Sequence, residues 1–127
     1  MAALTTYASD KCLNAILRDE PLSPPSTLYM ALYSTPQTVG ETGTECTDAN
    51  YARQQIAFNA ASSQVSTNNG TVTFPALTSN FSMASAGLCD AVTAGHCWIF
   101  DNQGAPIEFL AGNAPTLPDM SGTVSAF

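Results

Sequence analysis

The residues that could carry chemistry gather around the single histidine of the chain. His96 is followed directly by Cys97, and Cys89 lies a short distance before it. Structural zinc sites usually place two ligands roughly two to four residues apart, twice over. Adjacent residues on a strand point to opposite faces, so His96 and Cys97 cannot both face one metal. We therefore expect one of them to pack in a sheet, the other to face solvent, and no metal to be bound.

Nucleophilic catalysis would need a cysteine or serine, a histidine base and an orienting acid. Cys97, His96 and Asp101 supply these residue types. Neighbours on one strand are poorly placed to share a hydrogen bond, however, and the sequence contains no Gly-x-Ser-x-Gly motif. No Gly-rich loop joins a strand to a helix, as phosphate binding would require. The sequence therefore predicts no enzyme, no catalytic residue and no cofactor.

Acidic side chains form two further groups. Glu41, Glu45 and Asp48 fall in one segment, and Asp101 and Glu108 flank an expected turn. Paired carboxylates serve glycosidases, and several oxygen ligands suit calcium. The spacing matches no EF-hand, and acidic residues in loops are usually solvated. We therefore expect no site at either group.

Arg53 is the only cation outside the N-terminal segment, and it lies close to Glu45 and Tyr51 in the sequence. An arginine in this setting is expected to form a bidentate pair with a carboxylate and so fix the preceding loop to the sheet. Arginine and tyrosine are also enriched among interface anchors, which leaves an intersubunit contact as the alternative. Glu45, Tyr51 and Arg53 are therefore the candidate structural or interface residues.

The elements that must position these residues begin with one helix, predicted over residues 5–18. Its apolar residues form a stripe at helical spacing, and Pro21, Pro24 and Pro25 prevent its continuation. A helix this short is marginal alone, so we expect it to dock.

Strands follow the helix. The continuous apolar run at 28–33 (LYMALY) predicts a buried strand, and residues 34–50 predict a long surface loop. Alternation over 51–59 places Ile56 and Phe58 on one face and Tyr51 on the other. We then expect a polar connection at 60–69 and strands at 71–74 and 83–92. Residues 96–101 and 107–111 are expected to form a hairpin with its turn at 102–104, and an edge strand is expected within 123–127.

One helix with about six or seven short strands predicts a mainly β fold. We expect a single β-sandwich or barrel-like domain over 1–127, with the helix at 5–18, the β domain at 26–111 and an extended tail at 112–127. The four cysteines (Cys12, Cys46, Cys89 and Cys97) are expected to be free and mostly buried, with a bridge after release from the cell as the alternative.

The amino-acid composition argues against several classes of function. Charged residues make up 10% of the 127 residues, against about 25% in typical domains, and neutral polar residues replace them. Such surfaces suit proteins packed against copies of themselves. The formal charge is −7 with three basic residues, which argues against binding to nucleic acid or to an anionic membrane. The N-terminus lacks a secretion signal and no run is long enough to span a bilayer, so we expect folding in a host cytoplasm.

The order of motifs over 28–58 resembles a family of small tailed-bacteriophage virion proteins, of the tail-fibre or capsid-cement kind. The matching elements are LYMALY at 28–33, Thr35-Pro36, the Gly/Thr-rich segment 40–45, Tyr51-Ala52-Arg53 and the WIFD segment at 98–101 with Gly104. The resemblance implies a structural role in a virion.

Together these inferences predict a capsid decoration (cement) protein that binds and stabilises the assembled head. Its expected partners are the major capsid protein and copies of itself, as a dimer or trimer. A tail component, either a fibre base or a tail-decorating protein, is the first alternative. A carbohydrate-binding β module is the second, although such modules present exposed aromatic residues and the one tryptophan, Trp98, is expected to lie in the core.

Overall fold

The computed structural model describes residues 2–120 and 122–125. These residues form one helix and nine strands: β1 (Ala2–Leu4), α1 (Thr6–Arg18), β2 (Leu28–Tyr33), β3 (Gln54–Phe58), β4 (Val65–Asn69), β5 (Val72–Thr73), β6 (Phe81–Cys89), β7 (Cys97–Phe109), β8 (Thr116–Leu117) and β9 (Thr123–Ser125).

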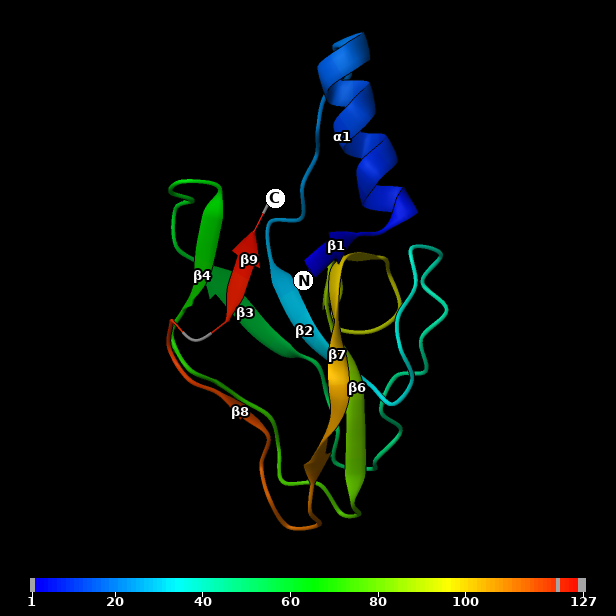
Figure 1. Cartoon of the computed structure of the whole chain (residues 1–127), viewed down its shortest axis with the longest axis vertical. Helices are drawn as coiled ribbons and strands as arrows, with labels where there is room; N and C mark the ends of the chain where they lie inside the picture. Colours follow the sequence, from blue (N-terminus) through cyan, green and yellow to red (C-terminus); the bar gives the residue numbers. More distant parts are fainter. Residues whose placement is uncertain (1, 121, 126–127) are drawn as a thin grey trace.

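Seven of the strands form one sheet in the order β1-β7-β6-β2-β3-β4-β9, and β5 pairs with β8 separately. All pairs are antiparallel. The sheet curls into a nearly closed barrel, and strands account for 40% of the chain. The predicted mainly β, barrel-like fold with one N-terminal helix is confirmed (Figure 1).

Helix α1 ends where the sequence predicted and begins one residue later, at Thr6, but its packing differs. Thr5 is the N-cap and its side chain accepts a hydrogen bond from the Ala8 amide, while Asp19 closes the other end in the left-handed conformation. Only Ala8 of the helix is buried. The rest of α1 projects from the sheet, and the linker returns from its far end to β2 (Figure 1). Among the described residues, the expected docking is seen only for the first turn of α1, where Tyr7 packs against His96 and Trp98.

Strand β2 matches its prediction residue for residue, and the packing explains its continuous apolar character. Leu32 faces a core cluster inside the barrel, which also holds Ile56 and Phe74. Ala31 and Tyr33 face a second cluster on the other side of the sheet. Because both faces of β2 are covered, both sets of alternating side chains must be apolar.

The predicted hairpin between 96–101 and 107–111 is wrong. Residues 97–109 form the single strand β7, and both of its halves pair with β6. The pairing register shifts between Met83 and Ser85 on β6. The turn signal at 102–104 therefore marks a bulge in a continuing strand.

Other boundaries also differ from the predictions. The polar segment 60–69 contains β4, so it is not only a connection. The strand expected over 51–59 covers only 54–58, and Tyr51, expected on the face opposite Ile56, packs with Phe74 at the core with ring centroids 6.1 Å apart. Strands β1 and β8 were not predicted. The expected edge strand is confirmed at 123–125, and residues 126–127 lie outside the described residues.

A buried asparagine joins β4 to the C-terminal segment. Asn68 is fully buried, and its side chain donates to the carbonyls of Gly70 and Pro118 at 2.8 and 3.0 Å. Its Oδ1 accepts from the Gly122 amide at 2.7 Å. This side chain therefore supplies bonds that the short strands cannot make themselves, and it explains how a polar segment becomes part of the sheet.

We predict that Asn68→Ala lowers the free energy of unfolding by about 2 kcal/mol, because buried partners lose their hydrogen bonds. Urea denaturation followed by intrinsic fluorescence measures the change. Asn69→Ala, at the exposed neighbouring position, is the matched control and should shift stability by less than about 0.5 kcal/mol. Equal effects of the two substitutions would contradict this role for Asn68.

Candidate functional site

The loop 34–50 is fixed to the rest of the molecule by its three carboxylates, each at a different place. Glu41 contacts residues at the start of β7, Glu45 contacts Arg53, and Asp48 contacts Thr78 and Ser79 before β6. All three acids lie in the predicted loop, but each forms hydrogen bonds with the folded chain and is not simply solvated, as loop acids usually are. Within the part of the chain that the structure describes, no group of three or more His, Cys, Asp or Glu side chains could hold a metal.

Arg53 forms the bidentate pair that the sequence predicted. Its Nε and Nη2 atoms donate to the two oxygens of Glu45, each at 2.8 Å. Nη1 donates to the carbonyls of Ala91 and Ala94 at 2.9 and 2.8 Å. The arginine side chain is 9% exposed and that of Glu45 is 28% exposed. Arg53 therefore connects the long loop, the entry to β3 and the 90–96 loop.

Tyr51 completes this arrangement. Its hydroxyl donates to Glu45 Oε1 at 2.7 Å and accepts from the Leu32 amide at 3.0 Å. Burial raises the pKa of Glu45, but hydrogen bonds from Arg53 and Tyr51 outweigh burial, and the net pKa is lowered. The hydrogen bond to Glu45 raises the pKa of Arg53. The structure thus brings all three predicted residues together in one hydrogen-bonded group that fixes the loop to the sheet.

His96 and Cys97 separate as the alternation of a strand requires. Cys97 is 4% exposed, whereas the His96 side chain is 50% exposed. The His96 ring stacks on Tyr7 of α1 with centroids 3.9 Å apart, and its Nδ1 lies 3.0 Å from Glu41 Oε2. The other oxygen of Glu41 accepts from the Cys97 amide. Glu41 therefore orients the histidine and the start of β7, and these contacts form no nucleophile–base pair.

The cysteines have free thiols, and three of the four are buried. Cys89 and Cys97 are directly opposite each other on β6 and β7. The Tyr33 hydroxyl lies 3.5 Å from the Cys89 sulfur. Both thiols border a cavity of about 380 Å³, lined by Tyr33, Gln37, Glu41, Gly43, Glu45, Arg53, Cys89, Gly95, His96 and Cys97. This cavity gathers more ionisable side chains than the sequence alone indicated.

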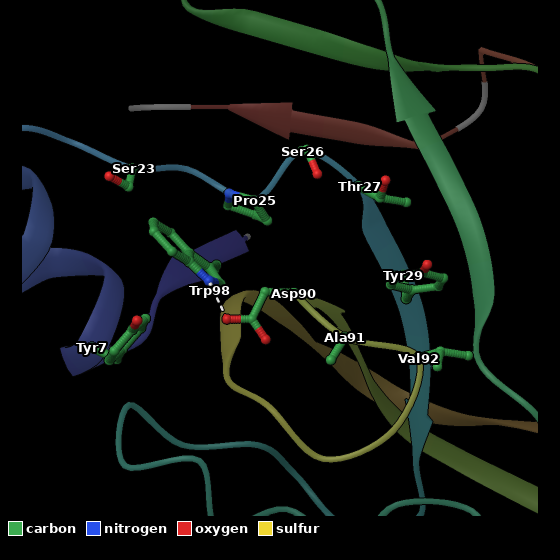
Figure 2. A pocket seen from close by; sticks show the side chains of 10 residues that line it. All are labelled: Tyr7, Ser23, Pro25, Ser26, Thr27, Tyr29, Asp90, Ala91, Val92 and Trp98. Atoms are coloured by element: carbon green, nitrogen blue, oxygen red, sulfur yellow. Dashed lines mark hydrogen bonds between the residues drawn. The ribbon is translucent and has the colours of Figure 1, made fainter.

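A second cavity, of about 400 Å³, lies between the helix linker and the 90–92 loop (Figure 2). Trp98 forms one wall, and its indole nitrogen donates to Asp90 Oδ2 at 3.1 Å. Asp90 Oδ1 accepts from the His96 amide. Trp98 is 9% exposed, as expected for a core residue. None of the exposed large apolar residues in the described part of the chain is aromatic.

The fold and the site define a small β structural protein in which paired charges hold a long loop against a barrel-like sheet. The chain belongs to the family of the Podophage GP4 fiber I protein gp80, whose family model matches residues 3–125. It is therefore a bacteriophage virion protein of a fibre-type structural family, as the sequence resemblance implied. No curated protein sequence has significant similarity to it. Within the described residues, no helix has the length and apolar character needed to cross a membrane.

We predict that Arg53→Ala lowers the free energy of unfolding by about 2–4 kcal/mol, because it leaves Glu45 partly buried without its partner. Chemical denaturation measures the loss. Arg18→Ala is the matched control, since the Arg18–Glu20 pair is 68% and 44% exposed and should contribute less than about 1 kcal/mol. A loss at Arg53 no larger than the loss at Arg18 would contradict a structural role for the Arg53–Glu45 pair.

The lowered pKa of Glu45 predicts a pH dependence of stability. A carboxyl whose pKa is lower in the folded state contributes stability above its unfolded pKa, and that contribution is lost as pH falls through the folded pKa. The wild type should therefore lose stability below about pH 4. Glu45→Gln should be less stable at neutral pH and lose less on acidification. Thermal unfolding from pH 7 to pH 2 tests this, and parallel curves for the two proteins would exclude the effect.

Proposed function

We propose that this protein is a structural component of the phage tail-fibre assembly, where it acts as an attachment module. The observation that carries the proposal is the exposed apolar surface of α1, formed by Leu13, Ile16 and Leu17. Their exposed fractions are 52, 78 and 74%. The family description, a fibre protein, supports the same assembly.

The projecting helix needs a partner for a physical reason. A helix of 13 residues is marginal in water unless an apolar face is buried. Within this chain α1 buries only Ala8. Leu13, Ile16 and Leu17 are spaced by three and four positions, so they lie along one face, as in helices that pack against helices. The same face on a second copy is the partner we propose.

The distribution of charge along the chain favours self-association through α1. Two of the three basic residues, Lys11 and Arg18, lie on α1, whereas Arg53 is engaged with Glu45. The helix is thus the least acidic part of a chain whose formal charge is −7. Identical copies meeting there repel one another less than they would elsewhere. Closed symmetry then uses one small patch several times, giving the dimer or trimer expected from the composition.

Attachment of this kind depends only on non-covalent contacts between subunits. A rigid oligomer binds several neighbouring subunits at once, so all of its contacts must break together before it leaves. The hydrogen-bonded group of Glu45, Tyr51 and Arg53 supports this attachment role, because it keeps the long loop in one conformation. The loop can then serve as a second contact surface. No step in this function requires a bond to be made or broken in a substrate.

We predict that Leu17→Asp converts the purified oligomer to a monomer, because it places a charge in the buried interface. Light scattering during size-exclusion chromatography measures the molar mass. Leu110→Asp is the matched control, since Leu110 is 58% exposed and lies outside α1, and it should leave the mass unchanged. A wild-type protein that remains monomeric at all concentrations would overturn self-association through α1.

The place of the protein in the virion is tested by labelling purified particles with an antibody against the chain. Label on the tail fibres is the expected result. Label on the head would select the capsid decoration role, in which the major capsid protein is the partner. Particles without label at either place would overturn the proposal of a virion attachment module.

A further inference from the structure

We propose that Cys89 and Cys97 are a thiol-oxidation site that closes to a cross-strand disulfide when the protein meets a low-molecular-weight disulfide. The two residues are register partners on adjacent antiparallel strands. Directly opposed residues in such a ladder have Cα atoms roughly 4.5–5.5 Å apart. Disulfides span roughly 4.4–6.8 Å between Cα atoms, so the bridge needs little movement of the backbone.

The pairing of these two thiols depends on a local irregularity in the sheet. Leu88 opposes Ile99, so a regular ladder would place Cys89 opposite Trp98. The register shift between Leu88 and Cys89 places it opposite Cys97 instead. Gly87 leaves room for the second thiol, because a Cβ at this glycine would lie 2.7 Å from the Cys97 sulfur. The register shift therefore brings the two thiols together, and the absence of a side chain at residue 87 leaves the space that the Cys97 sulfur occupies.

The cavity beside the pair gives a reagent access and favours one thiol as the nucleophile. The residues themselves are 1% and 4% exposed, but both line the cavity whose wall includes Arg53. A hydrogen bond from Cys97 lowers the pKa of Cys89, and further contributions come from Tyr33 and the charge of Arg53. The hydrogen bond to Cys89 raises the pKa of Cys97. The Cys97 thiol also donates to the Ile99 carbonyl at 3.2 Å, whereas the Tyr33 hydroxyl lies 3.5 Å from the Cys89 sulfur. Cys89 is therefore the thiol that ionises first and attacks.

The reaction proceeds by two exchange steps. The Cys89 thiolate attacks one sulfur of oxidised glutathione, forming a mixed disulfide and releasing one glutathione thiolate. Cys97 then loses its proton to solvent, and its sulfur attacks the Cys89 sulfur and releases the second glutathione. Two electrons pass from the cysteine pair to the reagent. The product links β6 to β7, the two longest strands of the sheet.

The test uses the full chain carrying Cys12→Ser and Cys46→Ser, so that the pair alone can react. The reduced protein is equilibrated with oxidised glutathione, and its intact mass and disulfide-linked peptides are measured. We expect a mass lower by two hydrogen atoms, a peptide joining Cys89 to Cys97, and a Tm several degrees higher that dithiothreitol reverses. Two thiols that remain free, or two glutathiones added without a bridge, would overturn the proposal.

A further variant identifies the order of the steps. Adding Cys97→Ser removes the resolving thiol, so the reaction should stop with one glutathione on Cys89. The matched variant Cys89→Ser should react at least tenfold more slowly at neutral pH, because Cys97 retains its proton. Equal rates would overturn the assignment of Cys89 as the nucleophile. Peptide mapping of the wild-type chain decides the existence of the bridge if either variant does not fold.

Discussion

The arginine at position 53 binds three separate parts of the chain to one another. Its guanidinium reaches Glu45 in the long loop and two carbonyls in the 90–96 loop. A planar group with five donors can bind both oxygens of a carboxylate side by side and still reach further acceptors, whereas the ammonium group of a lysine lacks this bidentate geometry. The chain has few charges and uses one of its three cations here. Arg53 therefore contributes to the position of the loop over the sheet and to the shape of the cavity beneath it, together with the contacts of Glu41 and Asp48.

Covering both faces of the sheet is the second constraint. The barrel interior holds one apolar cluster, and the long loop covers another on the outer side of β2, β6 and β7. The outer cluster is small, and it contains Tyr33, Cys89 and Cys97. Its thiols are therefore shielded without lying deep in the core. Both thiols nevertheless line the cavity beneath the loop.

The sequence predicts most clearly those features that depend on local patterns. The run at 28–33 lies between prolines and has no polar residue, so its bounds could be found without a structure. The pairing of Arg53 with Glu45 was also predictable, because a lone cation near a carboxylate has few alternatives. The role of Tyr51 was only partly predictable, since it lies before β3 and so does not follow the alternation of that strand.

Features that depend on distant partners could not be predicted in the same way. The segment 102–104 has the composition of a turn, yet both halves of β7 pair with β6, and only the register shows that the strand continues. Strand β4 is polar and depends on Asn68 and on the C-terminal segment. The anchors of Glu41 and Asp48 lie far away in sequence, so their identity emerges only from the folded chain.

The two ends of the seven-stranded sheet are β1 and β9, and each spans three of the residues that the structure describes. A sheet that does not close leaves peptide groups at its borders that can recruit strands from other molecules. Short border strands offer few such peptide groups, so pairing of the sheet edges of two molecules forms few hydrogen bonds. The short strands at these two borders therefore limit edge-to-edge pairing between copies of this chain.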